Sequence, residues 1–493
     1  MKKQYILSFD QGTSSSRTIL YNLDRQVLGM ESIELRSIYP ESGWVEQDPM
    51  EILNSQIASA SLLLIRLNIK VDEVIACGIT NQRETTVVWD KLSGKPIYNA
   101  IVWQDTRTSE YCQNLRKDGL EEVIQSKTGL MLDSYFSATK INWILNNVAR
   151  AKHKAEKGEL LFGTIDTWLL WNLTDGSHLT DFSNASRTML FNLKDERWDR
   201  ELLNLFNIPA SMLPDVIETS DDFGRIKPDI LGGEIPVNAM VGDQQAALYG
   251  QNCFKPGEVK NTYGTGCFML MNTGKKLVSS THGLISTIAW KIDGQIVYAL
   301  EGSIFIGGAL IQWLRDELGI IDDAASSEKM AKSLEDTNGV YIVPAFTGLG
   351  APHWDMTARG AITGLTRGSN KMHITRAALE AIAYQTKDVL NAMIKDSGLL
   401  LNALKVDGGA SQNNFLMQFQ ADILNVRVFR PKSVESTAMG AALLAGLKAG
   451  CWKTSGLEDQ GNGSQVFLPT MKDKERRSGY DGWINAVNLI KNQ

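Results

Sequence analysis

Hydrophobic and polar positions follow two periods along this chain, and their order predicts a mixed α/β fold. Short runs rich in branched and aromatic residues, such as Tyr5–Phe9, are typical of strands, whereas apolar positions at helical spacing across 50–67 predict a helix. Asp48 and Pro49 precede that helix, where an aspartate can accept from free backbone N–H groups and a proline suits the first turn. Because strand and helix patterns alternate throughout, α/β architecture is favoured over an all-helical or all-β domain.

Two distant segments share one pattern of strand, polar glycine-containing turn and second strand. The first comprises Tyr5–Phe9, the turn 10–16 and Arg17–Leu23; the second comprises Lys260–Tyr263, the turn 264–266 and Cys267–Met271. The repetition suggests that the two halves are structural relatives. Glycine turns between strands are common, so the pattern alone leaves coincidence open.

The length of 493 residues favours two lobes, because single hydrophobic cores seldom grow beyond roughly 250 to 300 residues. Lys255-Pro256-Gly257 punctuates the chain near its middle. We therefore predict an N-terminal lobe at 1–252 and a C-terminal lobe at 253–493. The segment from Trp452 through a turn at 461–465 is expected to be a polar tail that ends in one helix.

Composition and charge exclude several classes of protein. The net charge is -6 with no basic stripe, so a nucleic-acid partner is not expected. Five cysteines without CxxC spacing suit reduced thiols, and five scattered histidines without an HExxH pair disfavour a zinc site. The first apolar run is broken at Asp10, and no run reaches the roughly 18 residues of a membrane span. We expect a cytoplasmic protein without membrane insertion that acts on a small molecule.

The strongest phosphate-binding candidate is the turn DQGTSSSR at 10–17, since the chain has neither GxxxxGK[ST] nor GxGxxG after a strand. Gly12 lets backbone N–H groups approach a ligand, four hydroxyls add donors, and Arg17 adds a forked cation. Asp10 supplies the carboxylate that a magnesium ion beside phosphates requires. An ordinary polar hairpin turn is the alternative.

A second polar cluster, GITNQRETT at 78–86, stands between two apolar strand-like runs. Arg83 and Glu84 together offer donors and acceptors, which suits the neighbouring hydroxyls of a small polyol. Trp103 could provide an apolar wall for the CH face of such a ligand. The alternatives are an exposed ion-pair loop for the cluster and a core position for Trp103.

Two strand-to-helix junctions complete the candidates. In the first, Val237–Val241 is a strand and Asp243 begins a helix, at the strand end where ligands of open sheets bind; a simple N-cap explains Asp243 equally well. In the second, the glycines of VDGGASQNN at 406–414 precede the helix Phe415–Leu424. They would let a flat nucleoside lie against the backbone, although a tight turn is an equal rival.

Taken together, these segments resemble the FGGY carbohydrate kinases of the actin, Hsp70 and hexokinase superfamily. The resemblance spans nearly the whole chain: FDQGTSSSR at 9–17, GWVEQDP at 43–49, GITNQRETTVVWD at 78–90, NAIVWQD at 99–105, YFSATKINWIL at 135–145, GDQQAALYGQ at 242–251, NTYGTGCFMLMNTG at 261–274, ALEGSIF at 299–305, FTGLGAPHWD at 346–355 and VDGGASQNNFLMQFQADIL at 406–424. NQRET with GDQQAAL is similar to the branch that phosphorylates glycerol rather than to the xylulose or gluconate kinases.

The resemblance implies two RNase H-like α/β lobes around a central cleft, and transfer of the γ-phosphoryl group of ATP to glycerol. It places glycerol hydroxyls on Arg83, Glu84, Tyr135, Asp243 and Gln244, with Trp103 and Phe268 against the carbon skeleton. It places the nucleotide on Thr13, Ser14, Ser15, Arg17, Thr265, Gly308, Gln312, Gly409, Ala410 and Asn413. Asp10 would hold Mg2+, and Asp243 would be the catalytic base. A homo-oligomer, dimer or tetramer, is also implied, although the sequence itself gives no oligomeric state.

The chain departs from the family pattern in the loop 223–236. Glu234 stands where enterobacterial relatives carry the arginine of a fructose 1,6-bisphosphate site, and the loop lacks the histidine that is phosphorylated in Gram-positive relatives. Both kinds of control are therefore doubtful here. His353 and Thr106 also differ from many relatives, at positions away from the inferred reacting atoms. The rival functions are a nucleotide-driven switch of the actin type and a kinase for another polyol or ketose.

Overall fold

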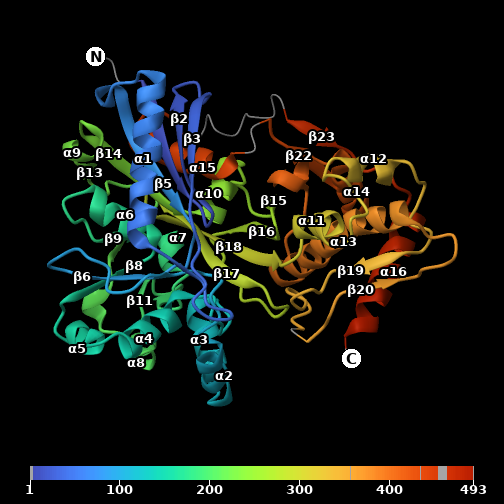
Figure 1. The fold of residues 1–493 in the computed structure, drawn as a ribbon, viewed down its shortest axis with the longest axis horizontal. Coiled ribbons are helices and arrows are strands. Elements are labelled where there is room, and N and C mark those ends of the chain that lie inside the picture. The colour runs from blue at the N-terminus through green and yellow to red at the C-terminus, as the bar shows by residue number, and fades with distance from the viewer. Residues whose placement is uncertain (1–3, 356, 433–434, 454–463, 492–493) are drawn as a thin grey trace.

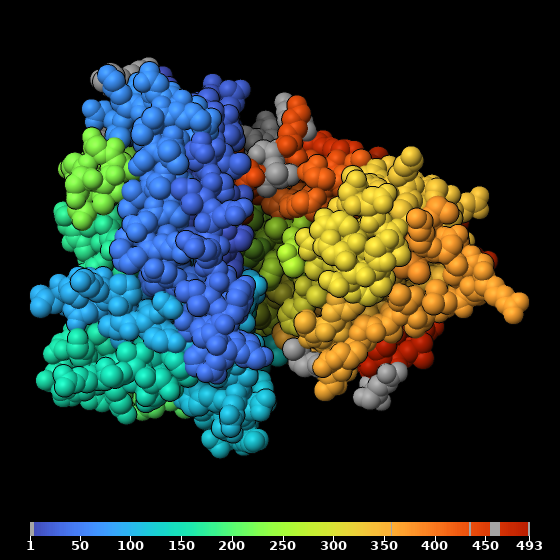
Figure 2. Space-filling model, viewed as in Figure 1, coloured from blue at the N-terminus to red at the C-terminus, as the bar shows by residue number. Residues whose placement is uncertain are grey.

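The computed structural model describes residues 4–355, 357–432, 435–453 and 464–491. They form two α/β lobes, one built mainly from the first half of the chain and one mainly from the second half (Figure 1). A cleft separates the lobes on the face seen in Figure 2. None of the helices among the described residues combines the length and apolarity that a bilayer span requires.

The first lobe is organised by a six-stranded sheet in the order β13-β14-β5-β1-β2-β3. Its strands are β1 (Tyr5–Gln11), β2 (Ser15–Asn22), β3 (Val27–Glu34), β5 (Val74–Asn81), β13 (Arg225–Ile226) and β14 (Ile235–Gly242). β1 is antiparallel to β2 and parallel to β5, which is in turn parallel to β14. In register, Asn81 lies opposite both Gln11 and Gly242. The carboxyl ends of three strands therefore meet at one edge of the sheet.

The second lobe repeats this arrangement in a seven-stranded sheet ordered β17-β18-β16-β15-β21-β22-β23. Its strands are β15 (Val259–Tyr263), β16 (Cys267–Gly274), β17 (Ile285–Ile292), β18 (Gln295–Ile304), β21 (Ala403–Asp407), β22 (Arg427–Arg430) and β23 (Gln465–Phe467). β15 is antiparallel to β16 and parallel to β21, as β1 is to β2 and β5. The repeated hairpin is thus part of a repeated sheet topology.

Helices cover both sheets and join the lobes. These helices include α1 (Pro49–Leu67), α10 (Asp243–Gly250), α13 (Lys371–Ser397), α14 (Asn414–Leu424), α15 (Ser436–Lys448) and α16 (Asp473–Ile490). α15 comes from the second half of the chain but packs on α10 and on the first sheet. The crossing is close because Gly440 has no side chain: a Cβ there would lie 1.9 Å from the carbonyl oxygen of Ala246.

Further elements fill the rest of the fold. Further helices are α2 (Ser109–Lys117), α3 (Glu121–Thr128), α4 (Ser137–Asn147), α5 (Ala151–Glu156), α6 (Ile165–Leu173), α7 (Phe182–Ala185), α8 (Arg200–Leu205), α9 (Pro228–Leu231), α11 (Gly308–Asp316) and α12 (Ser326–Lys332). Further strands are β4 (Glu46–Gln47), β6 (Val87–Asp90), β7 (Ala100–Ile101), β8 (Leu160–Gly163), β9 (Leu179–Asp181), β10 (Phe191–Asn192), β11 (Arg197–Trp198), β12 (Asp215–Ile217), β19 (Tyr341–Val343) and β20 (Ala361–Thr363).

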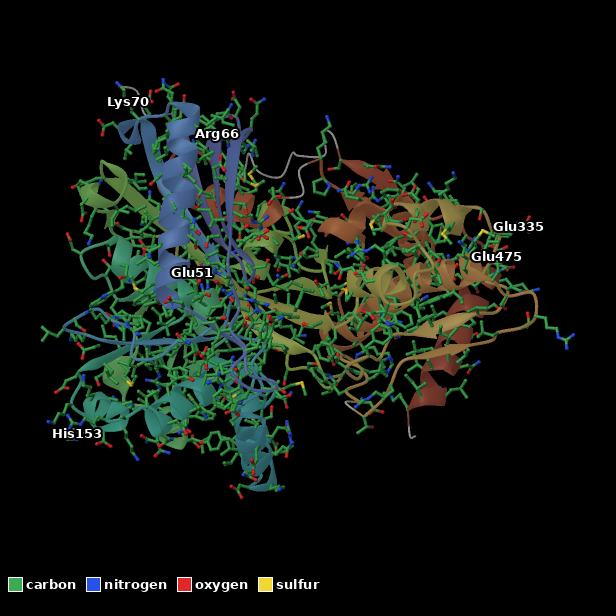
Figure 3. The ribbon with its side chains drawn as sticks, viewed as in Figure 1. Glu51, Arg66, Lys70, His153, Glu335 and Glu475 are labelled. Atoms are coloured by element: carbon green, nitrogen blue, oxygen red, sulfur yellow. The ribbon has the colours of Figure 1, made fainter. Side chains whose placement is uncertain are left out.

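Local sequence signals are confirmed where they were strong. The Asp48 side chain caps α1 by accepting from the Met50 N–H at 2.8 Å. Glu51 and Arg66 lie in the first and last turns of this helix, the favourable arrangement for its dipole (Figure 3). The first predicted turn, 10–16, is shorter than expected, because Asp10 continues the strand by pairing with Arg17.

The predicted polar tail requires a correction. Most of the expected turn at 461–465 lies outside the described residues, and Gln465 already belongs to β23 at the edge of the second sheet. The single terminal helix, α16, is confirmed, but it buries Trp483, Val487 and Ile490 against the second core. The part from Gln465 to Ile490 is therefore packed in the second lobe, whereas Trp452 packs on the first sheet, where its indole N–H donates to the Leu23 carbonyl at 2.9 Å.

Candidate active site

The predicted phosphate-binding turn spans residues 12–14 between β1 and β2, at the edge where three strands end. Gly12 N–H donates to the Ser15 carbonyl at 2.9 Å, which closes the turn, and the Ser14 side chain is exposed. Arg17 was expected to be available to phosphates, but both of its terminal nitrogens already bind carboxylates. One of its terminal nitrogens binds Asp10, and the other binds Glu435 at 2.8 Å. Arg17 therefore links the turn to the residue that precedes α15.

Asp10 is the innermost charge of this turn, with 2% exposure. Burial raises the pKa of Asp10 to about 6 against the opposing charge of Arg17, and the negative charges of Glu435 and Asp243 act in the same direction as burial. The carboxylate is thus only partly compensated, so a cation bound beside it would favour its ionised form.

The polar cluster at 80–85 is buried, so the exposed ion-pair loop is excluded. Each of its six residues is at most 3% exposed. Arg83 Nε forms an ion pair with Asp243 Oδ1 at 3.1 Å, and Arg83 Nη1 donates to Gln245 at 3.1 Å. Glu84 has a backbone φ of 63°, a left-handed conformation that is costly for a non-glycine residue and is often found at functional sites. This strained, buried cluster faces Asp243 from the neighbouring strand.

Three aromatic rings stand together beside this cluster. Trp103 makes edge contacts with Tyr135 and Phe268, at centroid distances of 5.5 Å and 6.3 Å. Its indole N–H donates to Thr13 Oγ1 at 2.9 Å. Trp103 is only half-buried, so it is not a core residue. It joins an apolar wall to the phosphate-binding turn.

Asp243 is the first residue of α10, and the residue that precedes the helix is Gly242. The N-cap interpretation of Asp243 therefore does not hold. Its side chain is 30% exposed, and its Oδ2 accepts from the Gln244 amide at 3.2 Å. The Gln244 carbonyl oxygen in turn accepts from the ammonium of Lys260, a buried residue of β15. A carboxylate oriented by both lobes is thus open to a ligand.

The second lobe contains a cavity of about 600 Å³. All six residues predicted to bind the nucleotide on this side line it: Thr265, Gly308, Gln312, Gly409, Ala410 and Asn413. Gly264 and Thr265 lie at the β15–β16 turn, and α11 begins beside them, since Gly308 N–H donates to the Gly264 carbonyl at 2.9 Å. Three segments far apart in the sequence, 264–265, 308–312 and 409–413, therefore contribute to one site.

Comparisons with known proteins agree with this arrangement. The model of the N-terminal domain of the FGGY family of carbohydrate kinases matches residues 5–250, and that of the C-terminal domain matches residues 259–449. The chain belongs to the FGGY family of carbohydrate kinases. Among curated proteins, it is 60% identical over 486 residues to a protein named glycerol kinase from Caldanaerobacter subterraneus, with 98% of each chain covered. A glycerol kinase from Carboxydothermus hydrogenoformans is 59% identical over 494 residues, with 100% of this chain and 99% of that protein covered.

Solved structures of FGGY kinases extend the similarity to the fold. The Plasmodium falciparum glycerol kinase with ADP has a TM-score of 0.94 at 38% identity, covering 100% of this chain and 99% of that one. Gluconate kinase from Lactobacillus acidophilus, at 23% identity and with 98% and 97% covered, has a TM-score of 0.89 and shares the fold alone. The predicted fold of two lobes around a cleft is confirmed.

Three charged residues of this FGGY kinase were missed as site residues. Glu301 on β18, Arg187 after α7 and Lys260 on β15 are all fully buried and bond to predicted site residues. Glu301 occupies a strand that is otherwise mostly apolar, and a charge inside such a run was the available signal. Lys260 is followed in its strand by Asn261 and Thr262, so it did not stand out in the same way. Ser327 and Glu328 of α12 also line the cavity, and no sequence pattern marked them.

Proposed function

We propose that this protein is a glycerol kinase, which transfers the γ-phosphoryl group of ATP to glycerol and gives sn-glycerol 3-phosphate and ADP, the entry step of glycerol catabolism. The curated relatives of nearly the same length carry this name. The observation that carries the proposal is one cluster of side chains that combines Arg83, Glu84 and Asp243 with aromatic rings and is hydrogen-bonded through Trp103 to the phosphate-binding turn.

This cluster suits a small polyol for a chemical reason. Each hydroxyl of glycerol both donates and accepts, so it needs donors and acceptors side by side. Arg83 donates, Glu84 and Asp243 accept, and Gln244 does both, while Tyr135 adds a phenol. Trp103 and Phe268 offer faces and edges to the CH groups. A ligand with three neighbouring hydroxyls on a short carbon chain satisfies all of these groups.

Asp243 is the proposed general base. Its carboxylate is partly exposed at the end of β14 and is oriented by Arg83 and Gln244. It accepts the proton of the attacking hydroxyl as the phosphoryl group is transferred. Phosphoryl transfer depends mainly on positioning and charge stabilisation, so the fixed geometry around Asp243 matters as much as its basicity.

The nucleotide is proposed to lie across both lobes. Its adenosine occupies the cavity lined by Thr265, Gly308, Gln312, Gly409, Ala410 and Asn413. Its phosphates reach the turn with Thr13, Ser14, Ser15 and Arg17, which neutralise developing charge. Closure of the lobes would exclude water and suppress ATP hydrolysis.

Asp10 is the proposed magnesium residue. Among the described residues, no group of three or more histidine, cysteine, aspartate or glutamate side chains could hold a metal alone. Mg2+ commonly binds through one or two carboxylates together with phosphate oxygens and water, which fits the buried and partly compensated Asp10. When bound, the ion would screen the negative charge of the ATP phosphates. A homo-oligomer, dimer or tetramer, and a cytoplasmic location stay predictions.

The test is an acceptor panel with purified protein, ATP and Mg2+, in which ADP release is coupled to a spectroscopic readout. Glycerol should give the highest kcat/KM among glycerol, erythritol, xylulose and dihydroxyacetone. A clear preference for another acceptor would overturn the assignment in favour of a different polyol or ketose kinase. ATP turnover that no acceptor stimulates would instead support a nucleotide-driven switch.

A further inference from the structure

We infer that Glu301 and Arg187 are positioning residues of the proposed glycerol site. Neither is proposed to contact glycerol: Glu301 holds Arg83 in position, and Arg187 holds Glu84. This inference rests on the proposed function. Neither residue was assigned by sequence motifs, and both have 0% exposure. Glu301 belongs to β18 in the second half of the chain, whereas Arg187 follows α7 in the first half.

The geometry of Glu301 is that of a clamp on two arginines. Its Oε2 accepts from Arg83 Nη1 at 2.6 Å and its Oε1 accepts from Arg83 Nη2 at 3.0 Å. The same Oε1 accepts from Arg187 Nη2 at 3.1 Å. A bidentate pair of this kind fixes the plane of a guanidinium group. In this position the remaining Nε of Arg83 lies 3.1 Å from Asp243 Oδ1, as an ion pair.

Arg187 performs the matching task for Glu84. Its Nε donates to Glu84 Oε1 at 2.5 Å, and its guanidinium carbon lies 5.7 Å from the centroid of the Tyr135 ring. Burial raises the pKa of Glu84, while the charges of Arg187 and Arg83 oppose this shift. Arg187 therefore both orients the Glu84 carboxylate and favours its ionised, hydrogen-bond-accepting form.

The electrostatics agree with a fixed, permanently charged clamp. Burial alone would raise the pKa of Glu301, but the charges of Arg187 and Arg83 lower it to about 2. Glu301 therefore stays ionised at neutral pH.

A purely structural role does not explain the cluster well. Arg187 Nη1 is buried and has no hydrogen-bond partner among the described residues. An unsatisfied buried donor is costly, and ion pairs of this burial are often replaceable by apolar side chains without loss of stability. Two bonds of the cluster join residues far apart in the sequence: Arg83 and Glu301 are 218 positions apart, and Glu84 and Arg187 are 103 positions apart. Each of these bonds ends on a side chain proposed to recognise glycerol. We conclude that the cluster holds Arg83 and Glu84 in the positions that glycerol binding requires.

The experiment compares wild-type enzyme with Glu301→Gln and Arg187→Lys. Gln keeps the shape of Glu301 but loses its charge and directs an amide N–H₂ at an arginine. Lys keeps the charge of Arg187 but lacks the planar guanidinium group that binds Glu84 and Glu301 at the same time. Each variant should raise the glycerol KM by about 10- to 100-fold, the usual effect of one lost charged hydrogen bond. The ATP KM should stay within about twofold of the wild-type value, because neither Glu301 nor Arg187 lines the nucleotide cavity.

Glu380→Gln is the matched control. Glu380 is also a buried glutamate paired with an arginine, since it accepts from Arg376 Nε at 2.8 Å, but it lies on α13. It should change thermal stability and leave the glycerol KM unaltered. Wild-type enzyme that does not phosphorylate glycerol would refute the proposed function and the inference with it. Normal wild-type turnover with an unchanged glycerol KM in both variants would refute the inference alone.

Discussion

Replacing Asp243 by asparagine separates the chemical role of this carboxylate from its structural one. Asparagine retains Oδ1, which lies 3.1 Å from Arg83 Nε and accepts from the Gln244 backbone N–H at 2.7 Å. It removes the negative charge and turns the second oxygen, which accepts from the Gln244 side chain at 3.2 Å, into an N–H₂ group. Because the side chain is 30% exposed, water can solvate the new group, and stability should change little.

The expected loss is therefore in turnover. A positioned general base contributes about 10²- to 10⁴-fold, which corresponds to about 2.7 to 5.5 kcal/mol in the activation free energy. We expect kcat of Asp243→Asn to fall by about that factor. The glycerol KM should change by only a few fold, since Arg83 keeps its partner.

The assay is coupled ADP release with glycerol varied at saturating ATP, together with a single-turnover measurement that isolates the phosphoryl transfer step. Asp229→Asn is a suitable control, because Asp229 is an exposed acidic residue in the first turn of another helix, α9. A kcat of Asp243→Asn within about threefold of wild type would refute the reasoning and leave Asp243 as a group that only orients the hydroxyl.

Three further changes test other parts of the structure. Ala410→Phe should fill part of the nucleotide cavity and raise the ATP KM several-fold without changing the glycerol KM; equal effects on both constants would contradict the assigned cavity. Burial lowers the pKa of Lys260 to about 8, so its ammonium donates to Gln244 below this pH and is lost above it. The glycerol KM should thus rise above pH 8 in the wild type, and a Lys260→Met variant that keeps this pH dependence would contradict the assignment. Gly440→Ala would place a Cβ 1.9 Å from the Ala246 carbonyl oxygen, and should lower the free energy of unfolding by at least about 1 to 3 kcal/mol; an unchanged denaturation midpoint would show that α15 can move aside.

The local elements of the fold were predictable because their causes are local. The cap of α1 needs only Asp48 and Pro49 before an apolar helical repeat, and the two hairpins need only strand residues around a glycine turn. The strand-to-helix junction at Asp243 was likewise visible in its own few residues. The limits of the first hairpin were less accurate, since cross-strand pairing of Asp10 with Arg17 extends a strand into residues that look like a turn.

The sequence alone determined the family resemblance, the two repeated hairpins and most of the residue types that the proposed chemistry requires. The tertiary structure decided which of these residues meet. The parallel register of β1, β5 and β14 brings Asp10, Arg83 and Asp243 to one edge, and it depends on contacts between segments far apart in the chain. The structure shows that the NQRET segment is buried in an ionic cluster rather than exposed as a polar loop, and that Glu301 and Arg187 belong to this cluster. No local pattern encodes these partners, because a buried charge is tolerated only where distant groups of opposite charge have been brought to it.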